Sequence, residues 1–150
     1  MNILGIDYGD NSIGLAIADN ILQVATPLKA FKEKTMRLDV DYIAKVCENE
    51  AIEKIVIGLP KNMDGSEGER ASKTRSFGNA LQKVTGLEII YKDERLSTAQ
   101  AKQGFSAFYD NFNIRTANTT AKKSAKKSGE LDTASAQIIL QSYLDGLRFL

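Results

Sequence analysis

The fold is decided by one stretch near the N-terminus, Ile3-Leu4-Gly5-Ile6-Asp7-Tyr8-Gly9. This short apolar run is typical of a buried strand, and the Gly-Asp-Asn-Ser sequence that continues it is typical of a turn. A second strand follows, over residues 12–19. The carboxylate of Asp7 then lies at the end of a hydrophobic strand, where its charge costs free energy unless a cation or hydrogen-bond donors compensate it. Asp7 is therefore interpreted either as a cap of the hairpin turn or as a metal ligand.

The length and composition indicate a single globular domain, since the chain has 150 residues, of which 43% are hydrophobic and 26% are charged. The formal net charge of +1 gives no global attraction to nucleic acid, so any basic surface must be local. The absence of histidine excludes His-based catalytic triads and His metal sites. The chemistry must then come from carboxylates, Lys, Arg, Tyr or hydroxyl groups.

The single cysteine, Cys47, cannot form an internal disulfide, and its place on the apolar face of a predicted helix indicates a packed core thiol. No apolar run approaches the roughly 18 residues that cross a bilayer. The N-terminus enters a strand directly, without the charged region and cleavage site of a signal peptide. We therefore expect a cytoplasmic protein with no membrane partner.

The rest of the chain alternates between predicted strands and helices. Apolar residues at three- and four-residue spacing predict the helices, and apolar runs bounded by turn residues predict the strands. The predicted elements are a strand at 22–28, a helix at about 35–49, a strand at 54–60, a helix at 69–84, a strand at 87–92, and helices at about 98–108 and 130–147. The fourth strand is expected to be buried on both faces and parallel to its neighbours, and Pro27 suits an edge or a strand end.

Two segments are candidates for substrate contact. The loop at 58–68 leaves the carboxyl end of a predicted parallel strand, and it is longer than a plain connection needs to be. Arg70, Lys73 and Arg75 follow it and form either phosphate contacts or a solvated face. The segment at about 110–129 has no apolar periodicity and is expected to be a flexible insert, either a linker or an arm that contacts phosphates. Its basic residues are Arg115, Lys122, Lys123, Lys126 and Lys127.

Further carboxylates fall where the ends of elements could bring them to Asp7. Asp93 and Glu94 follow the fifth predicted strand, and side-chain alternation lets only one of them face a ligand on a neighbouring strand. A salt-bridged turn with Arg95 is the alternative for this pair. Asp132 lies in the first turn of the last helix, where a carboxylate also suits the helix dipole. Such carboxylates can hold Mg²⁺ or Mn²⁺ for phosphodiester hydrolysis, which requires no histidine.

The order of elements, βββαβαβα, is that of the ribonuclease H-like fold, an α/β fold whose five-stranded mixed sheet is flanked by helices. Four motifs make a closer resemblance specific, and they lie at 1–19, 56–70, 93–101 and 132–145. Together they resemble the YqgF (RuvX) family, whose members are described as pre-16S rRNA nucleases and as Holliday-junction-resolvase-like proteins. The resemblance implies a cytoplasmic nuclease that matures the 5′ end of small-subunit ribosomal RNA.

Carried over motif by motif, the resemblance implies that the catalytic and metal-binding residues are Asp7, Glu94 and Asp132. The residues assigned to substrate contact are Arg70, Arg95, Arg115, Lys122, Lys123, Lys126 and Lys127. The chain departs from the family after Asp-Tyr-Gly, where Asp10-Asn11-Ser12 replaces the usual Thr-Lys-Arg or similar and removes positive charge beside the site. Ser135 stands where an alanine is usual.

Other functions stay open at this point. A Holliday junction resolvase, acting on branched DNA, would use the same chemistry, whereas a non-catalytic RNA-binding assembly factor would bind precursor RNA without cutting it. An actin-like ATPase also opens with Asp-x-Gly, but it needs two such domains, for which 150 residues leave no room. We expect a monomer or weak homodimer that binds precursor rRNA in preference to branched DNA.

Overall fold

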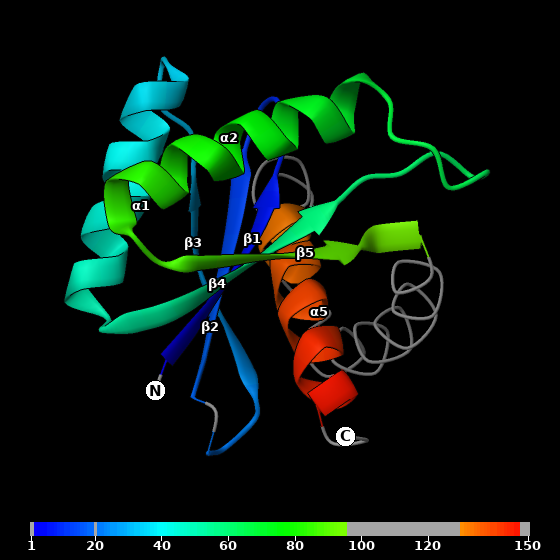
Figure 1. Cartoon of the computed structure of the whole chain (residues 1–150). Helices are drawn as coiled ribbons and strands as arrows, with labels where there is room; N and C mark the ends of the chain where they lie inside the picture. The colour runs from blue at the N-terminus through cyan, green and yellow to red at the C-terminus, as the bar shows by residue number, and fades with distance from the viewer. Residues whose placement is uncertain (1, 20, 96–129, 148–150) are drawn as a thin grey trace, which may run out of the picture.

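Five strands form one mixed sheet in the computed structural model, with helices on both of its faces (Figure 1). The structure describes residues 2–19, 21–95 and 130–147, with the side chains of the last helix from Ala134 onward. The elements in chain order are β1 (Asn2–Tyr8), β2 (Ile13–Asp19), β3 (Ala25–Phe31), α1 (Met36–Asn49), β4 (Ile52–Leu59), α2 (Glu69–Thr85), β5 (Glu88–Asp93) and α5 (Glu130–Leu147).

The strand order β3-β2-β1-β4-β5 places β1 at the centre of the sheet. β1 pairs antiparallel with β2 and parallel with β4, where Ile6 lies beside Ile57. β4 in turn pairs parallel with β5, where Leu59 lies beside Asp93. The C-terminal ends of β1, β4 and β5 therefore meet at one edge of the sheet, called the carboxyl edge below, which is where open α/β sheets bind their ligands.

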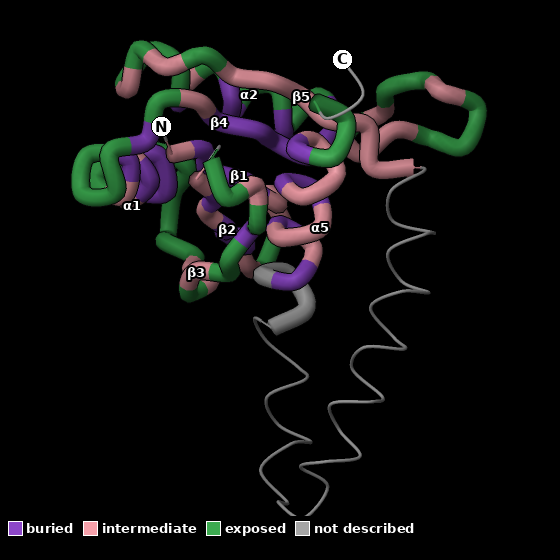
Figure 2. The backbone as a smooth tube through the Cα atoms, turned by 90° about the horizontal axis from the view of Figure 1, so that it is seen from below, coloured by how far each residue is buried: buried purple, intermediate pink, exposed green. Residues whose placement is uncertain are grey.

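Different helices pack on the two faces of the sheet. Helices α1 and α2 cover one face, where the core includes Leu4 and Phe77. Helix α5 covers the other face, where the core includes Ile3 and Leu140. Figure 2 shows the resulting buried stretch along β4, which has neighbours on both edges and helices on both faces. The two cores hold β1 and β4 rigidly, and these strands position the site described below.

Gly5 allows α5 to lie close against β1. A Cβ atom on Gly5 would lie 2.7 Å from the Cβ of Leu140 and 3.1 Å from the backbone oxygen of Ala136. Because successive side chains of a strand point to opposite faces, Asp7, two residues beyond Gly5, shares the face that α5 covers. The last helix and the Asp7 carboxylate are therefore on the same side of the sheet.

The structure confirms most of the predicted elements, including the parallel fourth strand beside the central first strand. The third strand, predicted at 22–28, instead spans Ala25–Phe31. The residues before it form a turn in which the Asp19 backbone oxygen accepts a hydrogen bond from the Gln23 N–H at 2.9 Å. Ile21 and Leu22 are 82% and 74% exposed in this turn. The prediction began the strand too early because it took the apolar Leu22 as a strand residue.

Cys47 lies on the buried face of α1, as predicted, and burial raises the pKa of its thiol to about 11. The predicted helix at 98–108 and the predicted flexible basic insert at 110–129 lie outside the described residues. Within the described ranges, no helix has both the length and the apolar character needed to cross a membrane.

Candidate active site

Asp7 is partly buried at the end of β1, on the α5 face of the carboxyl edge. The turn that follows is tight, since the Gly9 N–H donates to the Ser12 backbone oxygen at 3.1 Å. A Cβ atom on Gly9 would lie 2.5 Å from that same oxygen, so the turn requires glycine. The glycine thus fixes the chain immediately after Asp7.

Glu94 directly follows β5 and shares a hydrogen bond with Asp7. Its carboxylate crosses over β4 at Gly58, where a Cβ atom would collide with Glu94 Oε1 and would lie 2.5 Å from Cδ1 of Ile139. Because glycine has no side chain, the Glu94 side chain, which follows β5, can pass over β4 and reach Asp7 on β1. Sequence reasoning missed this role of Gly58, although a glycine that interrupts a buried β-branched run was a usable signal.

The environment of Glu94 favours its protonated form. Burial, followed by the charge of Asp7 and the hydrogen bond with it, raises the pKa of Glu94 to about 7, against the opposing charge of Arg70. Two carboxylates in contact cannot both ionise cheaply, so one proton is shared between them. Asp7 and Glu94 together thus form a site that favours bound positive charge.

Asp93 points away from this pair. The guanidinium of Arg95 holds its carboxylate in a fork, with Nη2–Oδ2 at 2.8 Å and Nε–Oδ2 at 3.1 Å. The Arg95 backbone N–H also donates to Asp93 Oδ1 at 3.0 Å. These hydrogen bonds lower the pKa of Asp93 to about 2. The structure therefore brings Glu94, and not its neighbour Asp93, to Asp7, and gives Asp93 the salt-bridged turn with Arg95.

Asp132 lies in the first turn of α5, and the structure describes the position of its backbone only. Later in α5, Gln141 lies at the start of β3, where its Oε1 accepts from the Ala25 N–H at 3.0 Å. Because Ala25 is in register with Ala18, and Ala18 with Ile3 at the start of β1, α5 runs antiparallel to β1. The first turn of α5 therefore lies toward the carboxyl edge.

The basic residues predicted to contact substrate fall into three groups. Arg70 is exposed near the start of α2, close enough to Glu94 for its charge to lower the pKa of that carboxyl. Arg95 is engaged by Asp93 and also donates to the Met63 backbone oxygen at 3.4 Å. The remaining five, Arg115, Lys122, Lys123, Lys126 and Lys127, lie outside the described residues.

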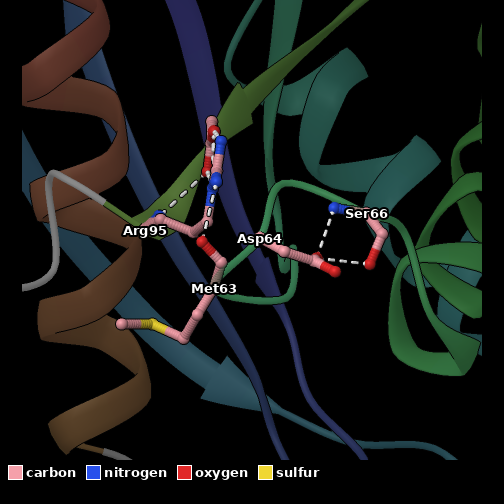
Figure 3. A network of polar contacts seen from close by, with 5 residues as sticks. Met63, Asp64, Ser66 and Arg95 are labelled. Atoms are coloured by element: carbon pink, nitrogen blue, oxygen red, sulfur yellow. Dashed lines mark hydrogen bonds and ion pairs between the residues drawn. The ribbon is translucent and has the colours of Figure 1, made fainter.

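The loop between β4 and α2, residues 60–68, extends beyond the end of β4 at the carboxyl edge (Figure 1). Its polar groups bond to one another, as Figure 3 shows for Asp64, whose Oδ1 accepts from both the N–H and the hydroxyl of Ser66. Arg95 joins this loop to the turn that carries Glu94, through Met63 on one side and Asp93 on the other. Arg95 thus bonds both to the loop and to the residue immediately before Glu94.

The chemistry of the donor set fits a hard divalent cation. Asp7 and Glu94 offer carboxylate oxygens, which suit Mg²⁺ and Mn²⁺, and a bound cation would offset the repulsion between the two negative charges that raises the pKa of Glu94. No group of three metal-ligating side chains occurs within the described residues. A third ligand would therefore come from Asp132, whose side chain is not among those described, or from substrate and water.

The fold and the carboxylate pair at the carboxyl edge define the chain as a ribonuclease H-like domain. The family model for RuvX, described as a Holliday junction resolvase, matches residues 1–146, and the chain belongs to this family. A relative from Ruegeria pomeroyi is 40% identical over 97% of this chain and 87% of its own length. One from Halothermothrix orenii is 39% identical over 97% and 95%. Both relatives carry the name "Putative pre-16S rRNA nuclease".

Solved structures support the fold. The chain is similar to RuvC of T. thermophilus in complex with a Holliday junction substrate, with a TM-score of 0.61 and 16% identity over 99% of this chain and 96% of that one. It is also similar to the Fowlpox virus resolvase bound to Holliday junction DNA, with a TM-score of 0.58 and 16% identity over 98% and 99%. At this identity, the likeness shows the ribonuclease H-like fold alone.

Proposed function

We propose that this protein is a metal-dependent endonuclease that hydrolyses phosphodiester bonds of RNA and processes the 5′ end of pre-16S rRNA in the cytoplasm. The observation that carries the proposal is the hydrogen bond between Asp7 and Glu94, two carboxyl groups that meet at the carboxyl edge. Membership of the RuvX family and the names of the relatives support the nuclease activity and the RNA substrate.

In this proposal Asp7, Glu94 and Asp132 hold Mg²⁺ or Mn²⁺ with their carboxylate oxygens. A metal held there would neutralise the charge of the phosphate and would lower the pKa of the attacking water. Glu94 gives up its proton when the site takes up positive charge, so both carboxylates then act as ligands. Gly58 keeps the path of Glu94 open, and Arg70 contacts the substrate backbone beside the pair. Arg115, Lys122, Lys123, Lys126 and Lys127 are proposed as further phosphate contacts.

The direct test is cleavage of labelled precursor rRNA by wild type and by Asp7→Asn, each with Mg²⁺ and Mn²⁺. The variant removes one negative oxygen ligand while conserving the size of the side chain, so we expect folded protein without activity. Asp41→Asn, an exposed carboxylate on α1, is the matched control and should cut like wild type. Full activity of Asp7→Asn would refute the assignment.

The family description favours a second candidate, cleavage of branched DNA. A four-way DNA junction, incubated side by side with the precursor RNA, distinguishes the two substrates. Faster cutting of the junction would make the protein a resolvase, and tight RNA binding without cutting under any divalent metal would make it an assembly factor. Sedimentation at micromolar concentration tests the proposed state, a monomer or weak homodimer, because a resolvase acting on a two-fold symmetric junction needs a dimer.

A further inference from the structure

The end of β1 extends beyond its pairing with β4. The parallel ladder between these two strands ends where Ile6 lies beside Ile57, one residue before Asp7. In the described sheet, Asp7 and Tyr8 are in register with β2 only. The other carboxylate of the site, Glu94, follows β5, which is held through β4. The backbone ladder therefore does not by itself set the position of Asp7 relative to Glu94.

Tyr8 anchors this end of β1 to α2. Because neighbouring side chains of a strand alternate, Tyr8 lies on the opposite face of the sheet from Asp7. Its ring stacks on that of Phe77 in α2, with the ring centroids 4.3 Å apart and the planes inclined by 12°. Phe77 is completely buried, so the ring that receives Tyr8 is itself fixed by the core.

Helix α2 runs across this face of the sheet and also contacts the strand that leads to Glu94 (Figure 1). A Cβ atom on Gly78, the residue after Phe77, would lie 3.0 Å from Cζ of Tyr91 on β5. The absence of a side chain at Gly78 thus lets β5 and α2 approach closely. Two consecutive residues of α2 therefore contact the strand that carries Asp7 and the strand that precedes Glu94.

A buried ion pair makes a second contact with Tyr8. Asp39, in the first turn of α1, is completely buried, and its Oδ2 accepts from Lys32 Nζ at 3.0 Å. Its Oδ1 accepts from the Glu33 N–H at 2.8 Å. The Lys32 ammonium lies over the Tyr8 ring, 5.1 Å from the centroid. Since Phe77 stacks against one face of this ring, the other face is left to the ammonium.

Stability alone is a poor explanation for this ion pair. A buried carboxylate loses its hydration, and replacing a buried ion pair with uncharged side chains of similar volume is often neutral or stabilising. Within the described part of the chain, no other carboxylate is as deeply buried as Asp39. What the pair provides is a positive charge fixed over the ring of Tyr8, the residue next to Asp7.

We propose that Tyr8 is a positioning residue for the nuclease site. Clamped between Phe77 and Lys32, its ring holds the end of β1 so that the two carboxylates of the site stay in contact. The clamp acts from the face covered by α1 and α2 and supplies the connection that the β1–β4 ladder lacks at this end of the strand. A displacement of about 1 Å can cost about 10²-fold in rate. This inference rests on the proposed function, because it concerns the same site.

The test combines calorimetric titration with Mn²⁺ alone, thermal unfolding without metal, and cleavage of precursor rRNA. Tyr8→Leu keeps an apolar side chain but loses both ring contacts, so we expect Mn²⁺ to bind about tenfold more weakly. We also expect kcat to fall with little change in KM. Tyr8→Phe keeps the ring and should restore Mn²⁺ binding to within about twofold of wild type. Val40→Ala removes buried methyl groups from the same core, so it should lower the unfolding temperature and leave Mn²⁺ binding unchanged.

The ion pair has a test of its own. Lys32→Met combined with Asp39→Asn removes both charges and keeps an oxygen acceptor for the Glu33 N–H, so the unfolding temperature should stay close to that of wild type. Mn²⁺ binding should still weaken by about threefold, because no charge then lies over the Tyr8 ring. Loss of Mn²⁺ affinity without loss of stability is the result that a merely structural ion pair would not give.

Two results would overturn this inference and leave the proposed function standing, because wild type would still bind Mn²⁺ and cleave RNA. One is wild-type Mn²⁺ affinity and kcat in Tyr8→Leu. The other is Mn²⁺ affinity that falls in proportion to the unfolding temperature in all the variants, Val40→Ala included, since the clamp would then be ordinary packing. Wild-type protein that neither binds Mn²⁺ nor cleaves RNA would overturn the proposed function and this inference together.

Discussion

Glu94 and Asp93 are neighbours in the chain, yet their carboxylates have opposite surroundings. Glu94 faces α5, contacts Asp7 and has its pKa raised to about 7, chiefly by burial. Asp93 faces the other way, is held by the fork of Arg95 and has its pKa lowered to about 2. One residue along a strand therefore separates a buried pair of carboxylates from a carboxylate in an ion pair with arginine. The buried pair is the one that fits a cationic ligand, and the ion pair fits a structural role.

The largest expected effect comes from removing the carboxylate of Glu94, the buried member of this comparison. Glu94→Gln keeps the size of the side chain and its hydrogen-bonding capacity but loses the negative ligand, so we expect RNA cleavage to fall by about 10³-fold. Single-turnover assays with Mn²⁺ measure the loss. Glu88→Gln, at the exposed start of β5 where the ion pair with Lys54 is 3.7 Å long, should retain wild-type activity. Comparable activity of Glu94→Gln and Glu88→Gln would remove Glu94 from the site.

A smaller loss is expected when Glu94 is displaced and not neutralised. In Gly58→Ala the new Cβ atom collides with the Glu94 carboxylate and with Ile139. We expect activity to fall by about 10²-fold. We also expect the free energy of unfolding to fall by about 1–3 kcal/mol. Gly146→Ala is the control, because a Cβ atom there meets nothing within 4 Å, and it should leave activity unchanged. Wild-type cleavage by Gly58→Ala would show that Glu94 does not need this path.

For Asp93, the ion-paired member of the comparison, the loss should be smaller still. Asp93→Asn weakens the fork with Arg95, and therefore loosens the loop as well as the turn that carries Glu94. Because Asp93 and Arg95 are about one-third exposed, we expect a stability loss of only about 1 kcal/mol. Cleavage should fall by about tenfold. Denaturant unfolding and the RNA assay measure the two effects. A loss as deep as that of Glu94→Gln would contradict the division of roles.

The smallest effect, and the one that most sharply separates the two carboxylates, is the dependence of stability on pH without divalent metal. The pKa of Glu94 is raised, so its contribution to stability is present below the ordinary pKa of 4.5 and is lost as the pH rises through about 7. The pKa of Asp93 is lowered, so its contribution is present above 3.8 and is lost as the pH falls through about 2. Glu94→Gln should therefore gain stability over wild type as the pH rises from about 5 to about 8.

Asp93→Asn should show the opposite trend. Its stability deficit should be constant near neutral pH and should disappear as the pH approaches about 2. Thermal unfolding of both variants and of wild type across this range measures the two trends in one series. Parallel pH profiles for the two variants would show that the carboxylates do not differ in the way described.

Much of the fold could be predicted because it follows from local patterns. The apolar runs around Ile6 and Ile57 and the helical spacing after Thr35 depend only on neighbouring residues, and the structure confirms the elements that they predict. The third strand was misplaced because Ile21 and Leu22 have strand-like side chains in a turn, and no local pattern shows that they are exposed. Composition alone could not distinguish these apolar residues from those of the core.

The site could be predicted only in part, since its decisive features connect distant strands. The pattern at Asp7 indicated a carboxylate in need of a partner, but the choice between Asp93 and Glu94 depends on where β5 ends, to within one residue. The role of Gly58 depends on a side chain that crosses from the neighbouring strand. Likewise, the prediction that Arg95 contacts substrate was made without its fork to Asp93 and its contact with loop 60–68.

The central claim, that Asp7 and Glu94 share a proton in a site suited to a divalent cation, is tested most directly by calorimetric titration with Mn²⁺ in buffers of different ionisation enthalpy. At about pH 6, where Glu94 is protonated, we predict that binding releases close to one proton per protein, and that the release falls toward zero above about pH 8. Glu94→Gln should bind Mn²⁺ more weakly and release no proton. Mn²⁺ binding that releases no proton in the wild type, or that is unchanged in Glu94→Gln, would contradict the account.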